Sequence, residues 1–178
     1  MRPPEIIYTE RLTLRRPRPS DAPAIFSAYA ADAEVARFVR WHPHTSVEET
    51  ERYVAACVAA WDGESRFPWV MELGEGGGPL GMVELRVDGF KADVGYVLAR
   101  PFWGRGLATE ALRPVVGWAL SRPEIYRVWA VCDAENVASA RVLEKVGMAR
   151  EGVLRRYILH PNVSDEPRDS LCYAAVKV

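Results

Sequence analysis

The sequence predicts a single α/β (α+β) domain in which a mixed central β-sheet is flanked by helices on both faces. Two strand-like segments, residues 67–73 and 80–87, are joined by Gly74-Glu-Gly-Gly-Gly-Pro79, which is typical of an antiparallel hairpin. Later strand-like segments alternate with helical patterns, which is typical of parallel connections. The 178 residues suit one domain with a substantial core, and we expect it to span residues 1–178.

The N-terminal part is expected to hold one strand and two helices before this hairpin. Residues 12–16 alternate as a strand does. A helix is expected to open at Ser20 and Asp21, with an apolar face formed by Ala24, Ile25, Ala28 and Tyr29. The segment Ser46-Val-Glu-Glu49 has the pattern of a capping box, and it predicts a second amphipathic helix that ends at Gly63.

The second half of the chain is expected to alternate strands with helices. The expected strands are residues 92–99, 127–131, 152–159 and 171–178. Leu107 begins an apolar pattern with helical spacing, and Asn136 begins a shorter helix. We expect Gly147 to end the shorter helix in a left-handed conformation, with Met148 packing back on its last turn.

The junction between residues 92–99 and the next helix has the features of an anion-binding site. Gly104 and Gly106 allow the backbone to curl, so that several N–H groups point at one phosphate near the positive end of the helix dipole. The turn lacks the Gly-Lys-Ser/Thr of a Walker loop and the further residues of the dinucleotide fingerprint. A phosphorylated cofactor is therefore expected here. The alternative is a tight strand-to-helix connection without a ligand.

Two segments together resemble the GNAT acetyltransferase superfamily. Trp103-Gly-Arg-Gly-Leu-Ala108 is similar to the pyrophosphate loop Arg/Gln-x-x-Gly-x-Gly/Ala of that family, with Trp in the first position. Asn136 and the Glu-Lys-Val-Gly-Met sequence that ends at Met148 are similar to its later helix. The Trp variant, followed by Thr109-Glu-Ala111, resembles the branch that contains the ribosomal-protein N-terminal acetyltransferases. The resemblance extends from Thr9 to the final strand.

The resemblance implies acetyl-CoA (coenzyme A) as the cofactor. It also implies that the strand before the loop splays from its neighbour, so that the Leu98 N–H reaches the thioester oxygen, a contact worth about 3–4 kcal/mol of barrier. Asn136 would bond the pantetheine amides, unless it only caps its own helix. The cofactor-binding residues expected on this basis are Tyr96, Val97, Leu98, Trp103, Gly104, Arg105, Gly106, Leu107, Ala108, Thr109, Asn136, Ser139 and Arg141.

Acetyl transfer to an amine requires a group that protonates the departing thiolate. The Tyr that most GNAT members use for this corresponds to Leu143, and the resemblance implies Ser139 instead. The alternative for Ser139 is a hydroxyl that bonds only within the first turn of its helix.

Transfer also requires a neutral amine, and hence a proton acceptor. The Glu that some members of the branch use corresponds to Ile158, so this role cannot be carried over. Glu84 is the first candidate, followed by Asp93 and His160. Each is also compatible with an ordinary strand or turn position. With Ser139 and Leu98, Glu84 completes the expected catalytic set.

Four further features limit the partners and the location. The net charge of −1 provides no long-range field, so neither nucleic acid nor a membrane is expected as a partner. No apolar run approaches the roughly 20 residues of a membrane span and the N-terminus lacks a signal-peptide core, so a cytoplasmic location is expected. The scattered cysteines are expected to be buried thiols, not disulfides, metal ligands or nucleophiles: Cys57, Cys132 and Cys172.

The segment between the two predicted N-terminal helices lies where related folds cover the acceptor. We expect Phe38 and Trp41 to form an apolar wall there, and His42 and His44 to be exposed. A third ligand of suitable spacing is missing from this segment, so no metal site is expected.

The leading hypothesis is an N-acetyltransferase that moves acetyl from acetyl-CoA to a primary amine by direct transfer in a ternary complex. The acceptor is a protein N-terminus or a small amine such as a polyamine, an amino acid or an antibiotic. A catalytically silent acyl-CoA-binding or sensor module is the alternative, favoured by Leu143 and Ile158 at the usual acid and base positions. A structural domain that binds no ligand is the third hypothesis. Exposed sheet edges are compatible with a monomer or a homodimer.

Overall fold

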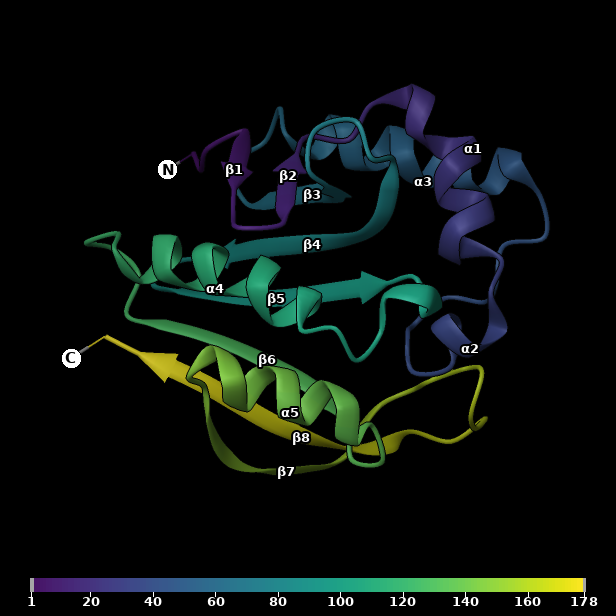
Figure 1. The fold of residues 1–178 in the computed structure, drawn as a ribbon. Coiled ribbons are helices and arrows are strands. Elements are labelled where there is room, and N and C mark those ends of the chain that lie inside the picture. Colours follow the sequence, from purple (N-terminus) through teal and green to yellow (C-terminus); the bar gives the residue numbers. More distant parts are fainter. Residues whose placement is uncertain (1, 178) are drawn as a thin grey trace.

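In the computed structural model, which describes residues 2–177, one eight-stranded sheet runs through the molecule (Figure 1). The strands are β1 (Ile6–Tyr8), β2 (Leu12–Arg15), β3 (Arg66–Leu73), β4 (Pro79–Asp88), β5 (Lys91–Leu98), β6 (Arg127–Asp133), β7 (Ala149–Ile158) and β8 (Arg168–Val176). They are ordered β1-β2-β3-β4-β5-β6-β8-β7. β5 and β6 are parallel, and all other neighbours are antiparallel. The predicted mixed sheet is confirmed.

Helices cover both faces of this sheet. They are α1 (Ala22–Ile25), α2 (Ala33–Ala36), α3 (Val47–Ala60), α4 (Leu107–Leu120) and α5 (Val137–Val146). Successive side chains of β4 point to opposite faces, and they show which helices lie on which side. Met82 packs in one cluster with α1 and α3, whereas Val83 and Leu85 pack in another with α4 and α5.

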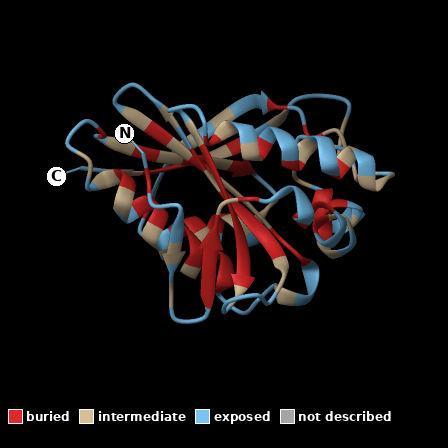
Figure 2. Cartoon of the chain, turned by 90° about the horizontal axis from the view of Figure 1, so that it is seen from above, coloured by how far each residue is buried: buried red, intermediate tan, exposed pale blue. Residues whose placement is uncertain are grey.

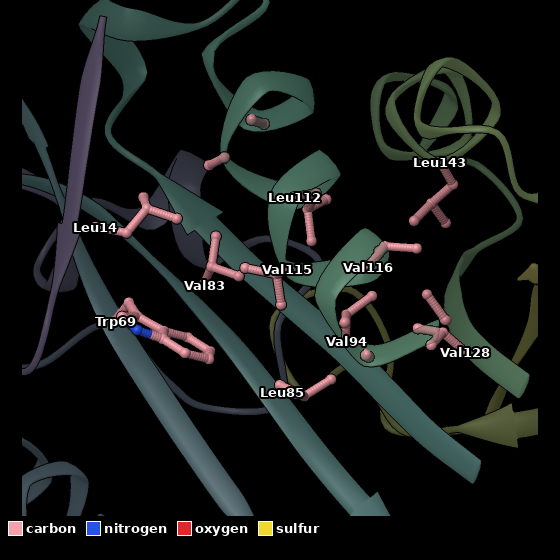
Figure 3. Packing of buried hydrophobic residues seen from close by; sticks show 14 of the residues in the cluster. Leu14, Trp69, Val83, Leu85, Val94, Leu112, Val115, Val116, Val128 and Leu143 are labelled. Atoms are coloured by element: carbon pink, nitrogen blue, oxygen red, sulfur yellow. The ribbon is translucent and has the colours of Figure 1, made fainter. Parts of the chain in front are cut away.

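The larger core lies between the sheet and α4. Figure 2 shows that buried residues follow the strands and the inward faces of the helices. Apolar residues at helical spacing on α4 meet alternate residues of four strands in Figure 3, namely Leu112, Val115 and Val116 against Trp69, Val83, Leu85, Val94 and Val128. This packing fixes α4 against β5, and so fixes the glycine-rich turn that joins them.

The first predicted helix is shorter and more irregular than expected. α1 is followed directly by a π-helical turn at Phe26–Ala30. Ile25 and Tyr29 are buried as expected, whereas Ala24 is exposed and Ala22 is buried in its place. The Asp21 carboxylate accepts hydrogen bonds from Arg15 and from the Arg18 N–H, so it does not cap the helix.

The predicted capping box at the start of α3 is shifted by one residue. Ser46 occupies the N-cap position, but its side chain makes no capping hydrogen bond. Glu49 reaches back to the Thr45 N–H at 2.8 Å instead. The helix ends at Ala60 and a turn leads on to Gly63, so the expected end is three residues too late.

Two elements lie outside the sequence prediction. β1 adds an edge strand that pairs with β2, with Ile7 opposite Leu14. α2 is a single turn capped by Asp32, whose side chain accepts from the N–H groups of Glu34 and Val35. α2 and the segment after it lie beside the loop between β7 and β8 (Figure 1).

Candidate active site

β5 and β6 diverge toward their carboxyl ends (Figure 1). They are paired only from Lys91 opposite Arg127 to Asp93 opposite Trp129. β5 nevertheless stays paired with β4 as far as Leu98. The edge of β5 that faces β6 is therefore open beyond the paired residues, which is the splay that the sequence analysis expected.

The open edge of β5 presents backbone donors. The Ala99 N–H donates to the Leu80 carbonyl at 2.8 Å, and in an antiparallel pair such residues alternate along the strand. The N–H groups of Leu98 and Tyr96 consequently point away from β4, into the opening. Val97 lies between them with its N–H directed at β4, so it can offer only its side chain to a ligand in the opening.

Trp103, at the variant position of the loop, is tied to the same strand. Its indole Nε1–H donates to the Leu98 carbonyl oxygen at 2.7 Å. This bond satisfies the carbonyl and holds the loop against β5, while the Leu98 N–H stays available.

The glycine-rich turn has the conformation that anion binding requires. Gly104 and Gly106 have φ values of +71° and +78°, which favour glycine. Gly106 is the N-cap of α4 and supplies no side-chain oxygen, so the N–H groups of the first turn are open to a ligand: Leu107, Ala108 and Thr109. A Cβ on Gly104 would meet no atom within 4 Å, so there is room above the turn. The turn can therefore accept an anionic group at the N-terminus of α4.

An ion pair from the N-terminal turn anchors the loop, and sequence reasoning missed it. The Arg11 guanidinium contacts Glu110 at 2.6 Å and donates to the Arg105 carbonyl at 3.0 Å. Burial alone would raise the pKa of Glu110, but hydrogen bonds from Thr9 and Arg11 lower it below its usual value. Thr9 and Arg11 lie in the N-terminal segment that resembles the family, and this resemblance was the only sign in the sequence that they contribute to the site. Their contact with the loop spans about a hundred residues of chain and has no local signature.

The Arg105 and Arg141 side chains are exposed. The Arg105 guanidinium stacks 5.5 Å from the centre of the Phe102 ring. Arg141 lies on α5, the helix that Asn136 caps. Both are free to approach a bound anion, and neither is buried as a preformed ligand.

A tyrosine and a serine from different elements meet beside the opening. The Asn136 Oδ1 accepts from the Ser139 N–H at 3.1 Å and so caps α5. The Ser139 hydroxyl lies 2.8 Å from the Tyr96 hydroxyl. Burial raises the pKa of Tyr96 far above its usual value, so the phenol stays protonated. It can therefore donate to Ser139, which leaves the serine hydrogen free for another acceptor.

Apolar side chains occupy the positions of the usual family acid and base. Leu143 is 1% exposed and packs in the core under α5, as Figure 3 shows, and Ile158 is also buried. Burial raises the pKa of the nearby Cys132 to about 11, against a weaker opposing effect of Ser139. That thiol is protonated at neutral pH and is a poor nucleophile.

Glu84 and Asp93, two of the expected base candidates, lie in a ladder of ion pairs. One oxygen of Glu84 contacts Arg66 and the other contacts Arg86, each at 2.9 Å. Arg86 also donates to Asp93. Glu84 lies opposite Gly95, three residues or about 10 Å along β5 from Leu98. Both carboxylates are therefore already engaged by guanidinium groups.

His160, the third candidate, is buried without a hydrogen-bond partner. It is 4% exposed, and neither ring nitrogen is bonded to any of the residues that the structure describes. Its Nε2 lies 3.8 Å from the Asp133 carboxylate, and the Phe38 ring packs edge-on against it at 6.4 Å. Asp133 is itself fully buried and accepts from Arg168 at 2.6 Å.

The loop between β7 and β8 is fastened to the segment that follows α2. The Asn162 amide donates to the carbonyls of Ala36 and Trp41 at 2.6 and 2.8 Å, and its oxygen lies 3.0 Å from a ring nitrogen of His42. His42 is exposed as expected. His44 is partly buried instead, because it bonds the Thr50 hydroxyl at 2.7 Å.

The comparisons with known proteins agree with this geometry. The acetyltransferase (GNAT) domain matches residues 11–149. The chain belongs to the GNAT acetyltransferase family. It is an N-acetyltransferase, and acetyl-CoA, the acyl donor of this family, is its cofactor. An uncharacterized N-acetyltransferase of Bacillus subtilis, YoaA, is 31% identical over 175 residues, 97% of each chain.

Two solved structures show the same fold. RimJ of Mycobacterium smegmatis in complex with CoA-disulfide has a TM-score of 0.86 and 26% identity, over 99% of this chain and 90% of that chain. RimL, a ribosomal L7/L12 alpha-N-protein acetyltransferase in complex with coenzyme A, has a TM-score of 0.86 and 22% identity, over 97% of this chain and 98% of that chain. Within residues 2–177, none of the helices has the length and apolar character that a membrane crossing needs.

Proposed function

We propose that the protein transfers acetyl from acetyl-CoA directly to a primary amine in a ternary complex. The observation that carries this is the divergence of β5 from β6 beside the glycine-rich turn, because it puts free N–H groups next to a phosphate cradle. An acyl-enzyme route would need a nucleophile, and the Cys132 thiol, with a pKa of about 11, is a weak one. Both substrates are therefore expected to be bound together.

Four groups of this chain act on the transfer step in this proposal. Bound acetyl-CoA supplies the acetyl group as a thioester. The Leu98 N–H stabilises the negative charge that develops on the carbonyl oxygen. Ser139 donates its proton to the departing sulfur, and the protonated Tyr96 phenol donates a hydrogen bond to the serine oxygen at 2.8 Å. Glu84 stays a proposed proton acceptor, although its two arginine partners oppose that role.

The same proposal assigns the residues that bind the cofactor. The first-turn N–H groups after Gly106 bind the pyrophosphate, helped by the dipole of α4. Asn136 has its oxygen committed to α5, so its amide N–H₂ would serve the pantetheine. Arg105 and Arg141 supply positive charge from the rim. Arg11 holds the loop in place through Arg105 and Glu110.

We propose a protein N-terminus or a small amine as the acceptor. The protein acceptor is supported by the names of RimL and by the branch resemblance. A small amine is supported by a spermidine N(1)-acetyltransferase of Escherichia coli, which is 26% identical over 46% of this chain and 44% of its own. Phe38 and Trp41, on the segment after α2, would contact the acceptor.

Thiol release tests the proposal. Acetyl-CoA is offered with a panel of N-terminal peptides, polyamines and amino acids, and the rate is followed with a thiol reagent. We expect turnover with at least one amine, with double-reciprocal plots that intersect. Parallel plots would contradict the ternary complex. Binding of coenzyme A without turnover on any amine would instead support a silent acyl-CoA-binding module.

A further inference from the structure

An unpartnered imidazole is buried beside the end of β6. His160 is 4% exposed, and neither ring nitrogen has a hydrogen-bond partner among the residues that the structure describes. A buried polar group that lacks a partner costs about 1–3 kcal/mol, so such groups need a reason. A ligand that supplies the missing partner is one such reason.

The position of this imidazole ties it to the proposed transfer point. Asp133, which faces His160, is the last residue of β6, and its carbonyl accepts from the Asn136 N–H at 2.9 Å. Ser139, the proposed acid, follows on the next turn of chain. Ser139 on α5, the proposed proton donor, therefore lies on one side of the end of β6, and His160, a candidate proton acceptor, lies on the other.

Ser139 and His160 lie on opposite faces of the sheet. Cys132 packs in the core with α4 and α5, and successive residues of a strand point to opposite faces. Asp133 consequently points to the other face, where Phe38 packs against His160. Asn162 fastens this loop to Ala36 and Trp41, so the imidazole is held under the segment that would cover the acceptor.

The charges around His160 suit a proton acceptor. Asp133 from β6 lies 3.8 Å from its Nε2, and Arg168 from β8 pairs with that carboxylate and with Glu135. Phe38, from the segment after α2, is neutral. Burial opposes ionisation of Asp133, but Arg168 and the Glu135 N–H lower its pKa below the usual value, so it is charged at neutral pH. Its charge favours the tautomer with hydrogen on Nε2, which leaves the Nδ1 lone pair free.

We propose that His160, oriented by Asp133, accepts the proton of the incoming ammonium group. This inference rests on the proposed direct transfer to an amine. His160 takes one proton from the ammonium, and the lone pair of the neutral amine forms the C–N bond as the C–S bond breaks. Ser139 gives its proton to the departing sulfur, and the second proton of the nitrogen replaces it on Ser139. The net products are an amide, a thiol and the one proton that His160 has taken up.

A set of matched variants tests this role. His160→Gln is compared with Glu84→Gln, the competing assignment, and with Glu124→Gln, an exposed residue on the turn before β6. We expect His160→Gln to lower kcat/KM for the amine at pH 7 by about 10²–10⁴-fold, with coenzyme A affinity unchanged. The loss should be smaller at high pH, where the amine is already neutral and needs no proton acceptor. Glu124→Gln should keep the parent rate.

Proton NMR on the unmodified protein gives an independent measurement if His160→Gln does not fold. The chain has three histidines, and the two exposed or partly buried ones can be assigned with His42→Gln and His44→Gln. We expect the third imidazole signal to shift when the amine is added. An unmoved signal, or the loss of rate in Glu84→Gln instead of His160→Gln, would overturn the inference. Absence of turnover in the parent protein would contradict the proposed function itself.

Discussion

Replacing Gly104 by alanine should change both the stability of the fold and the affinity for coenzyme A, and the two effects can be measured separately. Gly104 and Gly76 have φ values of +71° and +76°, and a Cβ would meet no atom within 4 Å at either position. Alanine should therefore cost the same backbone strain at both, about 1–2 kcal/mol. In a chain of this size the melting temperature should fall by about 2–8 °C in each variant.

The two variants should differ when coenzyme A is added. At a hundred times Kd, the cofactor should stabilise the parent by about 2.7 kcal/mol, or about 5–11 °C. A methyl group on Gly104 occupies space that a phosphate would use, and a tenfold loss of affinity would halve this gain to about 1.4 kcal/mol. Gly76→Ala should keep the full gain. Differential scanning fluorimetry measures both shifts, and an equal gain in the two variants would refute the cradle at Gly104.

Three further outcomes are expected. Ser139→Ala and Tyr96→Phe should each lower kcat by about a hundredfold or more, while calorimetry finds the coenzyme A affinity nearly unchanged. The control Ser121→Ala should change neither kcat nor this affinity. Because the pKa of Asp133 is lowered in the folded state, its ionised carboxylate stabilises the fold above the ordinary carboxyl pKa, and this stabilisation is lost as the pH falls through the folded pKa. The urea concentration at the unfolding midpoint should therefore decrease below about pH 4 in the parent, and decrease less in Asp133→Asn. Because the pKa of Cys132 is about 11, its alkylation in the native protein should be slow at pH 7 and rise about tenfold per pH unit, as peptide mass spectrometry can follow.

The parts of the site that depend on neighbouring residues were predictable from the sequence. Gly104 and Gly106 signal a tight turn because their missing side chains are local facts, and the apolar spacing after Leu107 signals the helix that the turn enters. Gly147 ends α5 as expected, with φ of +97° and a hydrogen bond from the Met148 N–H to the last turn. These features need no knowledge of the rest of the fold.

The contacts between distant segments were not predictable in this way. Tyr96 and Ser139 are 43 residues apart, and only the packing of α5 on the sheet brings their hydroxyls together. Arg11 reaches the loop because β1 and β2 turn beside the start of α4. Glu84 was a reasonable candidate by its place on the strand, but its arginine partners follow from the register of β3 and β4.

In the proposed binding mode, main-chain N–H groups at the start of α4 bind the phosphates of coenzyme A, and calorimetric titration can detect this binding. Gly106→Glu would bring a carboxylate to these N–H groups, and Gly78→Glu is the matched control, since both glycines have φ of +78°. We expect saturable heat from the parent and from Gly78→Glu, and none from Gly106→Glu. Absence of heat from the folded parent at millimolar coenzyme A, or unchanged binding by Gly106→Glu, would contradict the claim.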